Sequence, residues 1–299
     1  MKFKAFLELG RISNLPTCLS NATAGFYLGG GDLVSHPVQW SAAVVATLCF
    51  YEGGLFLNDI FDFSTDLRER PERPIPSGRV LLNEARWGVV VFFLIGWLCV
   101  LLAFPHAFWI ALVLNALVIQ YNWVHSVFSL SPLLMGGCRA CVYWLAAAAA
   151  VEFAGHTGSL IAGSVILLGY IAAVSLVARD ELSSQVLFRQ KLGSALVLLM
   201  MVLAVLLSGS HLGFFENSSL ELRLTWIFCS GFAVIWIGAA VSRLFRSQMT
   251  PRAAVGRFLA GMSLLDTVLL SSLGEPWLVV LGVGCFTGTL VSHRWIRGT

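Results

Sequence analysis

Three aspartates and an asparagine lie at helical spacing where an apolar stretch ends. The segment NDIFDFSTD contains Asn58, Asp59, Asp62 and Asp66. This spacing predicts that the three carboxylates share one face of a helix, where like charges repel. A divalent cation between them would remove the repulsion. Because Mg²⁺ prefers hard oxygen ligands and completes its shell with water and substrate phosphates, the segment predicts a site for Mg²⁺ and a phosphate-bearing substrate.

A basic, proline-rich segment follows directly. LRERPERPIPSGRV places Arg70 and Arg73 beside prolines that stiffen the chain. Guanidinium groups bind phosphate oxygens through charge-assisted hydrogen bonds, so this segment is suited to hold a diphosphate. Each charge taken alone could be an ordinary helix-end or loop charge, but that explanation fits the combined pattern poorly. We therefore interpret residues 58–86 as an active-site loop.

The composition excludes a water-soluble globular domain. Of the 299 residues, 58% are hydrophobic and only 12% are charged, whereas soluble domains contain about 25% charged residues. The apolar residues form ten blocks of roughly membrane-spanning length. We predict an all-α, polytopic transmembrane helical bundle of nine or ten spans, forming a single domain over residues 1–299. The expected segments are 15–30, 40–57, 87–104, 107–123, 132–151, 159–178, 193–210, 226–243, 255–272 and 277–293.

The basic residues predict which end of this bundle faces the cytoplasm. With the N-terminus inside, alternate loops hold 17 of the 19 Lys and Arg residues, and the opposite loops hold only Arg223. Because Lys and Arg are retained on the cytoplasmic side, we expect a multi-pass integral membrane protein with its active site facing the cytoplasm. This would be the inner membrane in a bacterium. Residues 1–12 are expected to form an amphipathic helix on the membrane surface. The net charge of +3 is too small to indicate a nucleic-acid partner.

Arg139 is the remaining basic residue, and it lies inside an apolar segment. A charged side chain within the bilayer is costly and usually faces a cavity or a partner. Two partners are considered for it: a substrate phosphate and the carboxylate of Glu52 in the second predicted span. The nearby Cys138 and Cys141 form a CxxC pattern without a second ligand pair, so we interpret them as packing residues.

The polar positions of residues 58–78 resemble the first signature of the UbiA superfamily of intramembrane prenyltransferases. The family pattern, NDxxDxxxD followed by RPxRPIPSG, is matched at every polar position. Looser matches are Asn14 before the first span, Tyr121 with Asn122 at the end of the fourth, and Leu265 with Asp266 in a late polar helix. The sequence ARDE at residues 178–181 resembles the EboC-like branch of the superfamily, which belongs to secondary metabolism.

The resemblance implies a Mg²⁺-dependent transfer of a prenyl group from an isoprenyl diphosphate to an aromatic or other lipophilic acceptor within the membrane. With the pattern above, it assigns each polar residue a role. The candidate metal ligands are Asn58, Asp59, Asp62 and Asp66. The candidate diphosphate contacts are Arg70, Arg73, Arg139 and Arg179. The candidate pocket residues are Asn14, Tyr121, Asn122, His125 and Glu181. The candidate catalytic residues are Asp62, Asp66 and Asp180.

The sequence departs from the family pattern at the second acidic motif, usually DxxxD after the sixth span. Asp180 is followed four residues later by Ser184, and Glu181 is its immediate neighbour. Adjacent helical residues point about 100° apart, so a second metal site is incomplete. His125 stands where the family usually has lysine. The alternative function is therefore a non-enzymatic UbiA-like protein that binds or transports a lipidic secondary-metabolite precursor. Prenyl length, acceptor and oligomeric state stay open.

Overall fold

The computed structural model describes residues 2–125, 128–150, 157–179, 186–210 and 218–296, and these parts of the chain are helical, without strands. The elements at the N-terminal side are α1 (Lys2–Leu9), η1 (Ile12–Asn14), α2 (Leu15–Leu28), α3 (Pro37–Phe61), α4 (Phe63–Glu69), α5 (Leu82–Ala103), η2 (Pro105–Ala107) and α6 (Phe108–Val124). The elements that follow are α7 (Ser131–Ala149), α8 (Thr157–Ala178), α9 (Phe188–Gly209), α11 (Leu220–Phe245), α12 (Pro251–Ser271) and α13 (Pro276–Ser292).

Each of the ten predicted apolar segments coincides with one of these helices. Within the described residues, eight helices have the length and apolar composition to cross a membrane, and α13 is a shorter apolar helix of 17 residues. Helix α2 has 14 residues and is almost wholly buried, so its polar side chains face other helices rather than lipid. The predicted all-helical, multi-span fold is confirmed, and the observed helices are consistent with nine or ten spans.

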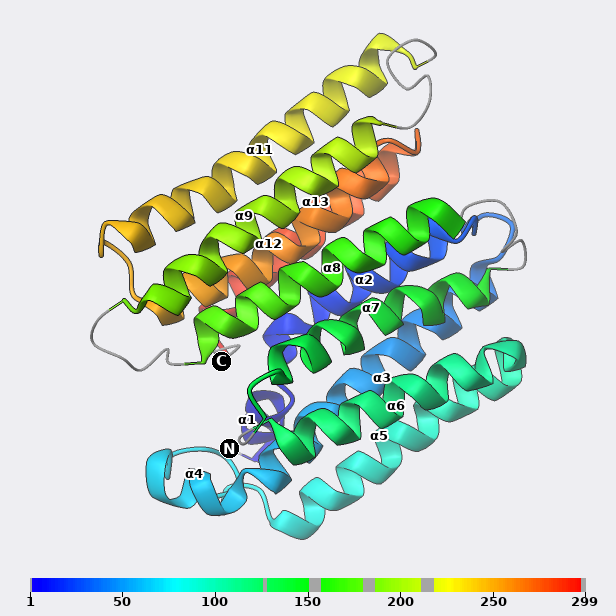
Figure 1. Cartoon of the computed structure of the whole chain (residues 1–299). Helices are drawn as coiled ribbons and strands as arrows, with labels where there is room; N and C mark the ends of the chain where they lie inside the picture. The colour runs from blue at the N-terminus through cyan, green and yellow to red at the C-terminus, as the bar shows by residue number, and fades with distance from the viewer. Residues whose placement is uncertain (1, 126–127, 151–156, 180–185, 211–217, 297–299) are drawn as a thin grey trace.

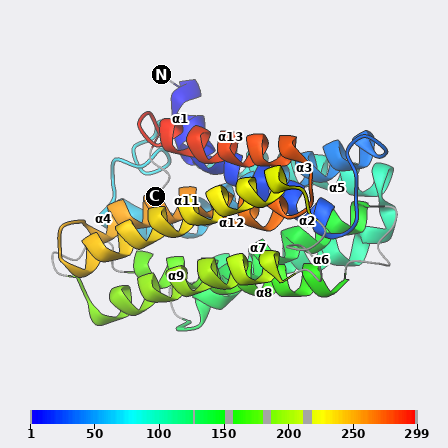
Figure 2. The same cartoon turned by 90° about the horizontal axis from the view of Figure 1, so that it is seen from above.

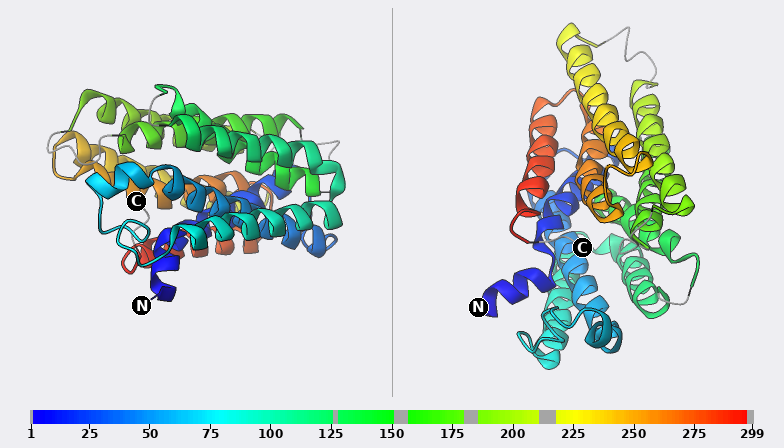
Figure 3. Two further views of the ribbon diagram at one scale, coloured as in Figure 1. Left: turned by 90° about the horizontal axis from the view of Figure 1, so that it is seen from below. Right: turned by 90° about the vertical axis from the view of Figure 1, so that its left-hand side faces the viewer.

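The long helices lie side by side, and their connections gather at two opposite ends of the bundle (Figure 1). Helices α1 and α4 and the C-terminal end lie at the same end, as the view from above also shows (Figure 2). Seen from that end, α1 extends away from the bundle (Figure 3, right). The basic segments that were predicted to share one side of the membrane therefore share one end of the molecule.

Helix α12 forms the centre of the bundle, and α5 lies at its surface. Of the most apolar part of α12, 78% is buried, against 17% for α5. Helix α12 packs against α2, α8, α9, α11 and α13, whereas α5 packs mainly against α3. Because lipid is as apolar as a protein core, α5 loses little by exposing its leucines and valines, and α12 can carry the polar residues that need protein partners.

Helices α2 and α7 approach each other closely because the contact is made by small residues. A Cβ atom placed on Gly25 would lie only 2.5 Å from the Cα atom of Tyr143. One turn further, a Cβ atom on Gly29 would lie 2.7 Å from the Cα atom of Ala147. Small side chains allow such backbone contact between membrane helices. The contact fixes the position of α2 relative to α7, and both helices carry buried polar residues described below.

We expect Gly25→Ala to destabilise the fold by about 1–3 kcal/mol, because the added methyl group meets backbone atoms that cannot move aside. The measurement is thermal unfolding of the purified protein in detergent. The matched control is Gly231→Ala in α11, where a Cβ atom would meet nothing within 4 Å. Equal effects of the two substitutions would contradict the close α2–α7 contact.

Candidate functional site

The acidic segment is divided between two helices. Helix α3 ends at Phe61, Asp62 is the capping residue with φ −80° and ψ −3°, and α4 begins at Phe63. The amide of Asp62 donates to the carbonyl of Asn58, and the carbonyl of Asp62 accepts from the amide of Asp66. The expectation that all three carboxylates share the face of one continuous helix is therefore wrong. The chain changes direction at Asp62, so Asp59 belongs to α3 and Asp66 to α4.

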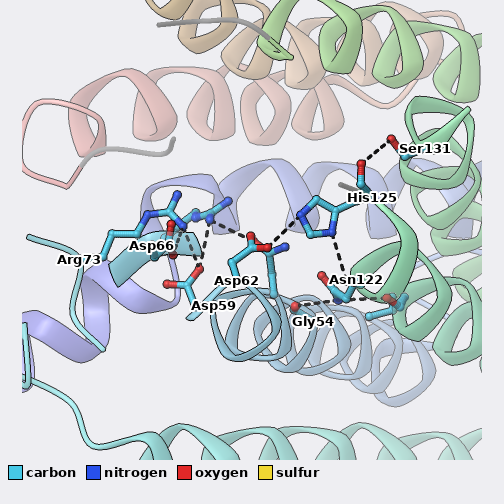
Figure 4. A network of polar contacts seen from close by, with 11 residues as sticks. Gly54, Asp59, Asp62, Asp66, Arg73, Asn122, His125 and Ser131 are labelled. Carbon is cyan, nitrogen blue, oxygen red and sulfur yellow. Dashed lines mark hydrogen bonds and ion pairs between the residues drawn. The ribbon is translucent and has the colours of Figure 1, made fainter. Parts of the chain in front are cut away.

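Arg73 connects the two helices by contacting both of their carboxylates (Figure 4). Its Nη1 atom lies 2.6 Å from Oδ2 of Asp66 and 3.8 Å from Oδ1 of Asp59. Both aspartates are 5% exposed. Arg11 adds a second cation, with Nη2 lying 3.3 Å from Oδ1 of Asp59 and 3.3 Å from Oδ1 of Asn58. The proline-rich segment therefore folds back onto the acidic segment, and their charges are paired.

Asp62 points the other way, toward α6 (Figure 4). Its Oδ1 lies 3.1 Å from Nε2 of His125, whose ring stacks against Tyr121 with 5.4 Å between the centroids. The hydrogen bond to Asp62 raises the pKa of His125. The nearby Asn122 is buried and donates to the carbonyls of Gly54 and Val118. Three residues predicted at this site, Asp62, Asn122 and His125, are thus brought together.

The carboxylates suit a divalent cation by their chemistry, although the geometry differs from the prediction. Within the described parts of the chain, no group of three or more His, Cys, Asp and Glu side chains is arranged to hold a metal ion. Asp59 and Asp66 nevertheless both contact one guanidinium nitrogen, so a positive charge already lies between them. Carboxylate oxygens with a neighbouring asparagine are the hard donors that Mg²⁺ prefers. The residues therefore fit the ion, with Arg73 occupying part of its place.

Other predicted site residues have different partners. Arg179 donates to the carbonyls of Phe128 and Ser129 and so joins the end of α8 to the α6–α7 connection. Oδ1 of Asn14 lies 2.8 Å from Nε2 of His293, the residue that follows α13. Arg70 is the capping residue of α4. The second acidic motif, with Asp180 and Glu181, lies outside the described residues.

Arg139 does not pair with Glu52, one of the two partners considered from the sequence. Its Nη1 donates to Sγ of Cys18 at 3.1 Å and to Oδ1 of Asn21 at 3.0 Å, and its guanidinium lies 4.7 Å from the ring centre of Tyr51. Oε1 of Glu52 has no hydrogen-bond partner within the described structure. The proposed Arg139–Glu52 pair is therefore wrong. Asn21 replaces Glu52 because α2 packs directly against α7.

A partly open pocket lies between α2, α3, α6 and α7. Tyr121 and Asn122 line it on α6, next to the His125–Asp62 pair, and Arg139 lines it on α7. Most of the other lining side chains are apolar. They include Phe50, Leu55, Leu114, Val118, Met135 and Val142. The pocket thus combines an apolar interior with polar groups from α3, α6 and α7.

Sequence reasoning missed four residues of this region. Arg11 was treated as part of a surface helix, yet it bonds to Asn58 and Asp59. Cys18 and Asn21 were not singled out, although a polar residue in an apolar span was the available signal for Asn21. Asp266, noted only as part of a late polar helix, is fully buried and hydrogen-bonded to Asn21. All four contacts join segments far apart in the sequence.

We expect Arg73→Met to destabilise the protein in metal-free buffer by about 1–4 kcal/mol, between the values typical of exposed and buried ion pairs. The two carboxylates would then gain more from an added cation, so Mg²⁺ should raise the unfolding temperature more in this variant than in the unmodified protein. Thermal unfolding with and without Mg²⁺ measures both effects. Arg68→Met, on the exposed side of α4, is the matched control. A Mg²⁺ response equal to that of the control would contradict a shared cation position.

Comparison with known proteins agrees with the motif and the fold. The model of the UbiA prenyltransferase family matches residues 18–262. Digeranylgeranylglyceryl phosphate synthases are similar to parts of the chain. That of Sulfurisphaera tokodaii is 34% identical over 121 residues, covering 40% of this chain and 43% of the relative. That of Ignicoccus hospitalis is 43% identical over 86 residues, covering 28% and 27%. The matches thus span less than half the length of these relatives.

Two solved structures share the fold over nearly the whole chain. A UbiA homologue from Aeropyrum pernix K1, without ligand, has a TM-score of 0.67 at 16% identity and covers 87% of this chain and 98% of its own. A digeranylgeranylglyceryl phosphate synthase structure has a TM-score of 0.59 at 18% identity and covers 96% and 99%. With the family model covering most of the sequence and the helical bundle in agreement, the chain belongs to the UbiA prenyltransferase family.

Proposed function

We propose that the protein transfers a prenyl group from an isoprenyl diphosphate to a lipophilic acceptor in a Mg²⁺-dependent reaction. The observation that carries this proposal is the joining of Asp59 and Asp66 through Arg73, beside an apolar pocket that begins at Tyr121 and Asn122. Carboxylates for a cation, arginines for phosphate and an apolar cavity are the three elements that such a substrate requires. The digeranylgeranylglyceryl phosphate synthases similar to this chain support prenyl transfer by their names.

The positively and negatively charged residues of the site have different roles. Arg70 and Arg73 bind the diphosphate, whose negative charge grows as the allylic carbon–oxygen bond breaks and the electron pair moves to the leaving group. Asn58, Asp59, Asp62 and Asp66 would hold Mg²⁺, which would supply further positive charge to stabilise the departing diphosphate. The nucleophilic atom of the acceptor forms the new bond to the prenyl carbon and releases its proton. The apolar pocket excludes the water that would otherwise capture the prenyl cation.

The proposal also covers the orientation of the active site in the membrane and the role of the second acidic motif. The active site faces the cytoplasm, which the gathering of basic segments at one end of the bundle supports. Asp180 and Glu181, which lie outside the described residues, are assigned to the same site by the family resemblance alone. The incomplete spacing of that second motif favours a second candidate: a member of the family that binds or moves a lipidic precursor without turnover.

We expect the purified protein to release diphosphate from geranyl, farnesyl or geranylgeranyl diphosphate when Mg²⁺ and a panel of lipophilic acceptors are present. Asp62→Ala should lower this rate by at least about a hundredfold, because removing even an outer partner of a metal site costs about 10–100-fold. The measurement is phosphate release after addition of pyrophosphatase, with product identification by mass spectrometry.

Glu69→Ala is the matched control, because Glu69 is an exposed acid on α4 outside the charge cluster. It should retain the rate of the unmodified protein. Retained binding of prenyl diphosphates with no turnover across the whole acceptor panel would reject the transferase and leave the binding or transport function.

A further inference from the structure

One side of α11 carries large apolar side chains that no other helix covers. Phe228 is 74% exposed, Ile235 is 71% exposed and Leu224 is 55% exposed. These positions recur at helical spacing, so the three side chains lie on one face of α11. Helix α11 has the length and composition of a membrane span. Because lipid tails are as apolar as leucine, acyl chains can cover this face without loss.

Two arginines continue the same face at the end of α11. Arg243 lies in the last turn, and Arg246 is the capping residue of the helix. Arg246 follows Phe228 by about five helical turns, so the two residues lie nearly in line along the helix axis. Both arginines are exposed, and neither forms an ion pair within the described structure. The apolar face of α11 therefore ends in two cations that the described parts of the protein do not neutralise.

Neighbouring helices bring further positive charge to this end. Nζ of Lys191 on α9 lies 5.9 Å from the ring centre of Phe245, the last residue of α11. The guanidinium of Arg257 on α12 lies 5.1 Å from the ring centre of Trp236 on α11. Helix α11 packs against both α9 and α12. The connection between α11 and α12 lies at the same end of the bundle as α4 (Figure 1).

The acidic residues of these three helices lie elsewhere. Within the described residues, α9 contains no Asp or Glu, and the acid of α11 is Glu221 in its first turn, at the opposite end. The acid of α12 is Asp266, which is buried and lies about four turns from the start of that helix. The described ends of α9, α11 and α12 therefore present a surplus of positive charge beside an apolar face.

We propose that this face of α11 binds an anionic phospholipid of the adjoining leaflet. The acyl chains lie along Phe228 and Ile235, and the phosphate accepts charge-assisted hydrogen bonds from Arg243 and Arg246. Basic clusters at the ends of membrane helices are typical of sites for anionic headgroups. The face has the two parts of such a lipid in the same order, apolar and then charged. This inference does not rest on the proposed function.

The test is native mass spectrometry of the full chain purified in detergent. The probes are phosphatidylglycerol and phosphatidylcholine with identical acyl chains, which differ in the net charge of the headgroup. The unmodified protein should bind phosphatidylglycerol about thirtyfold more tightly, the factor expected for two basic residues beside an anionic lipid. The double variant Arg243→Gln/Arg246→Gln should lose this preference. Size-exclusion chromatography checks its fold.

The matched control changes the same amount of charge elsewhere at the same end. Lys4→Gln/Arg294→Gln replaces two exposed basic residues outside α11 and should keep the preference of the unmodified protein. This control separates a site on α11 from the general attraction between anionic lipid and a positively charged end. A second measurement needs no variant. Raising the salt concentration should weaken binding of phosphatidylglycerol more than binding of phosphatidylcholine, because exposed charges are screened.

Four results would overturn the inference. They are equal affinity of the unmodified protein for the two lipids, a preference that survives the double variant, and an equal loss in the control variant. The fourth is displacement of phosphatidylglycerol by excess inorganic phosphate, which would show an anion site without a place for acyl chains. None of these measurements depends on turnover. A protein that binds phosphatidylglycerol through α11 but releases no diphosphate would contradict the transferase alone.

Discussion

Charge inside an apolar environment is the constraint on which this structure depends. A charged group within a lipid bilayer costs several kcal/mol unless it has a partner or faces a cavity. The bundle satisfies this requirement at two places. At one end, Arg73 and Arg11 pair with Asp59, and Arg73 also pairs with Asp66. Deeper in the bundle, Arg139 and Asp266 share Asn21 as an intermediate. Each of these two places is a polar centre, where charged side chains contact partners from other helices.

The two centres differ in how firmly they are closed. Asp266 accepts hydrogen bonds from Ser20, Asn21 and Tyr143, and its helix is the most buried of the eight long apolar helices within the described residues. The acidic segment, by contrast, ends one helix and begins another, and one of its partners, Arg73, comes from a loop rich in proline. Such a combination of a rigid interior and an adjustable end suits a substrate with two parts. The highly charged part must enter and leave at the end, while the apolar part stays bound in the interior.

The sequence predicted the elements better than the contacts between them. Apolar segments of membrane-spanning length and the motif from Asn58 to Gly78 are local patterns, and the helices and the family confirm them. The change of direction at Asp62 was not predictable from spacing, because helical periodicity continues through it. The partners of Arg139 were also missed, since α2 meets α7 through Gly25, and a glycine carries no signal of what it touches. The role of Arg11 was also missed, because its contacts with Asn58 and Asp59 depend on how segments far apart in the sequence pack together.

The glycine contact between α2 and α7 also determines which walls of the pocket are able to change shape. With Gly25 and Gly29 set against the backbone of α7, these two helices form a rigid seam that neither slides nor separates without loss of contact. Cys18 and Arg139 stand on either side of that seam and keep a constant spacing. The opposite walls, α3 and α6, are therefore the ones that can move to fit ligands of different width. They are also the walls through which an apolar molecule could enter from the lipid.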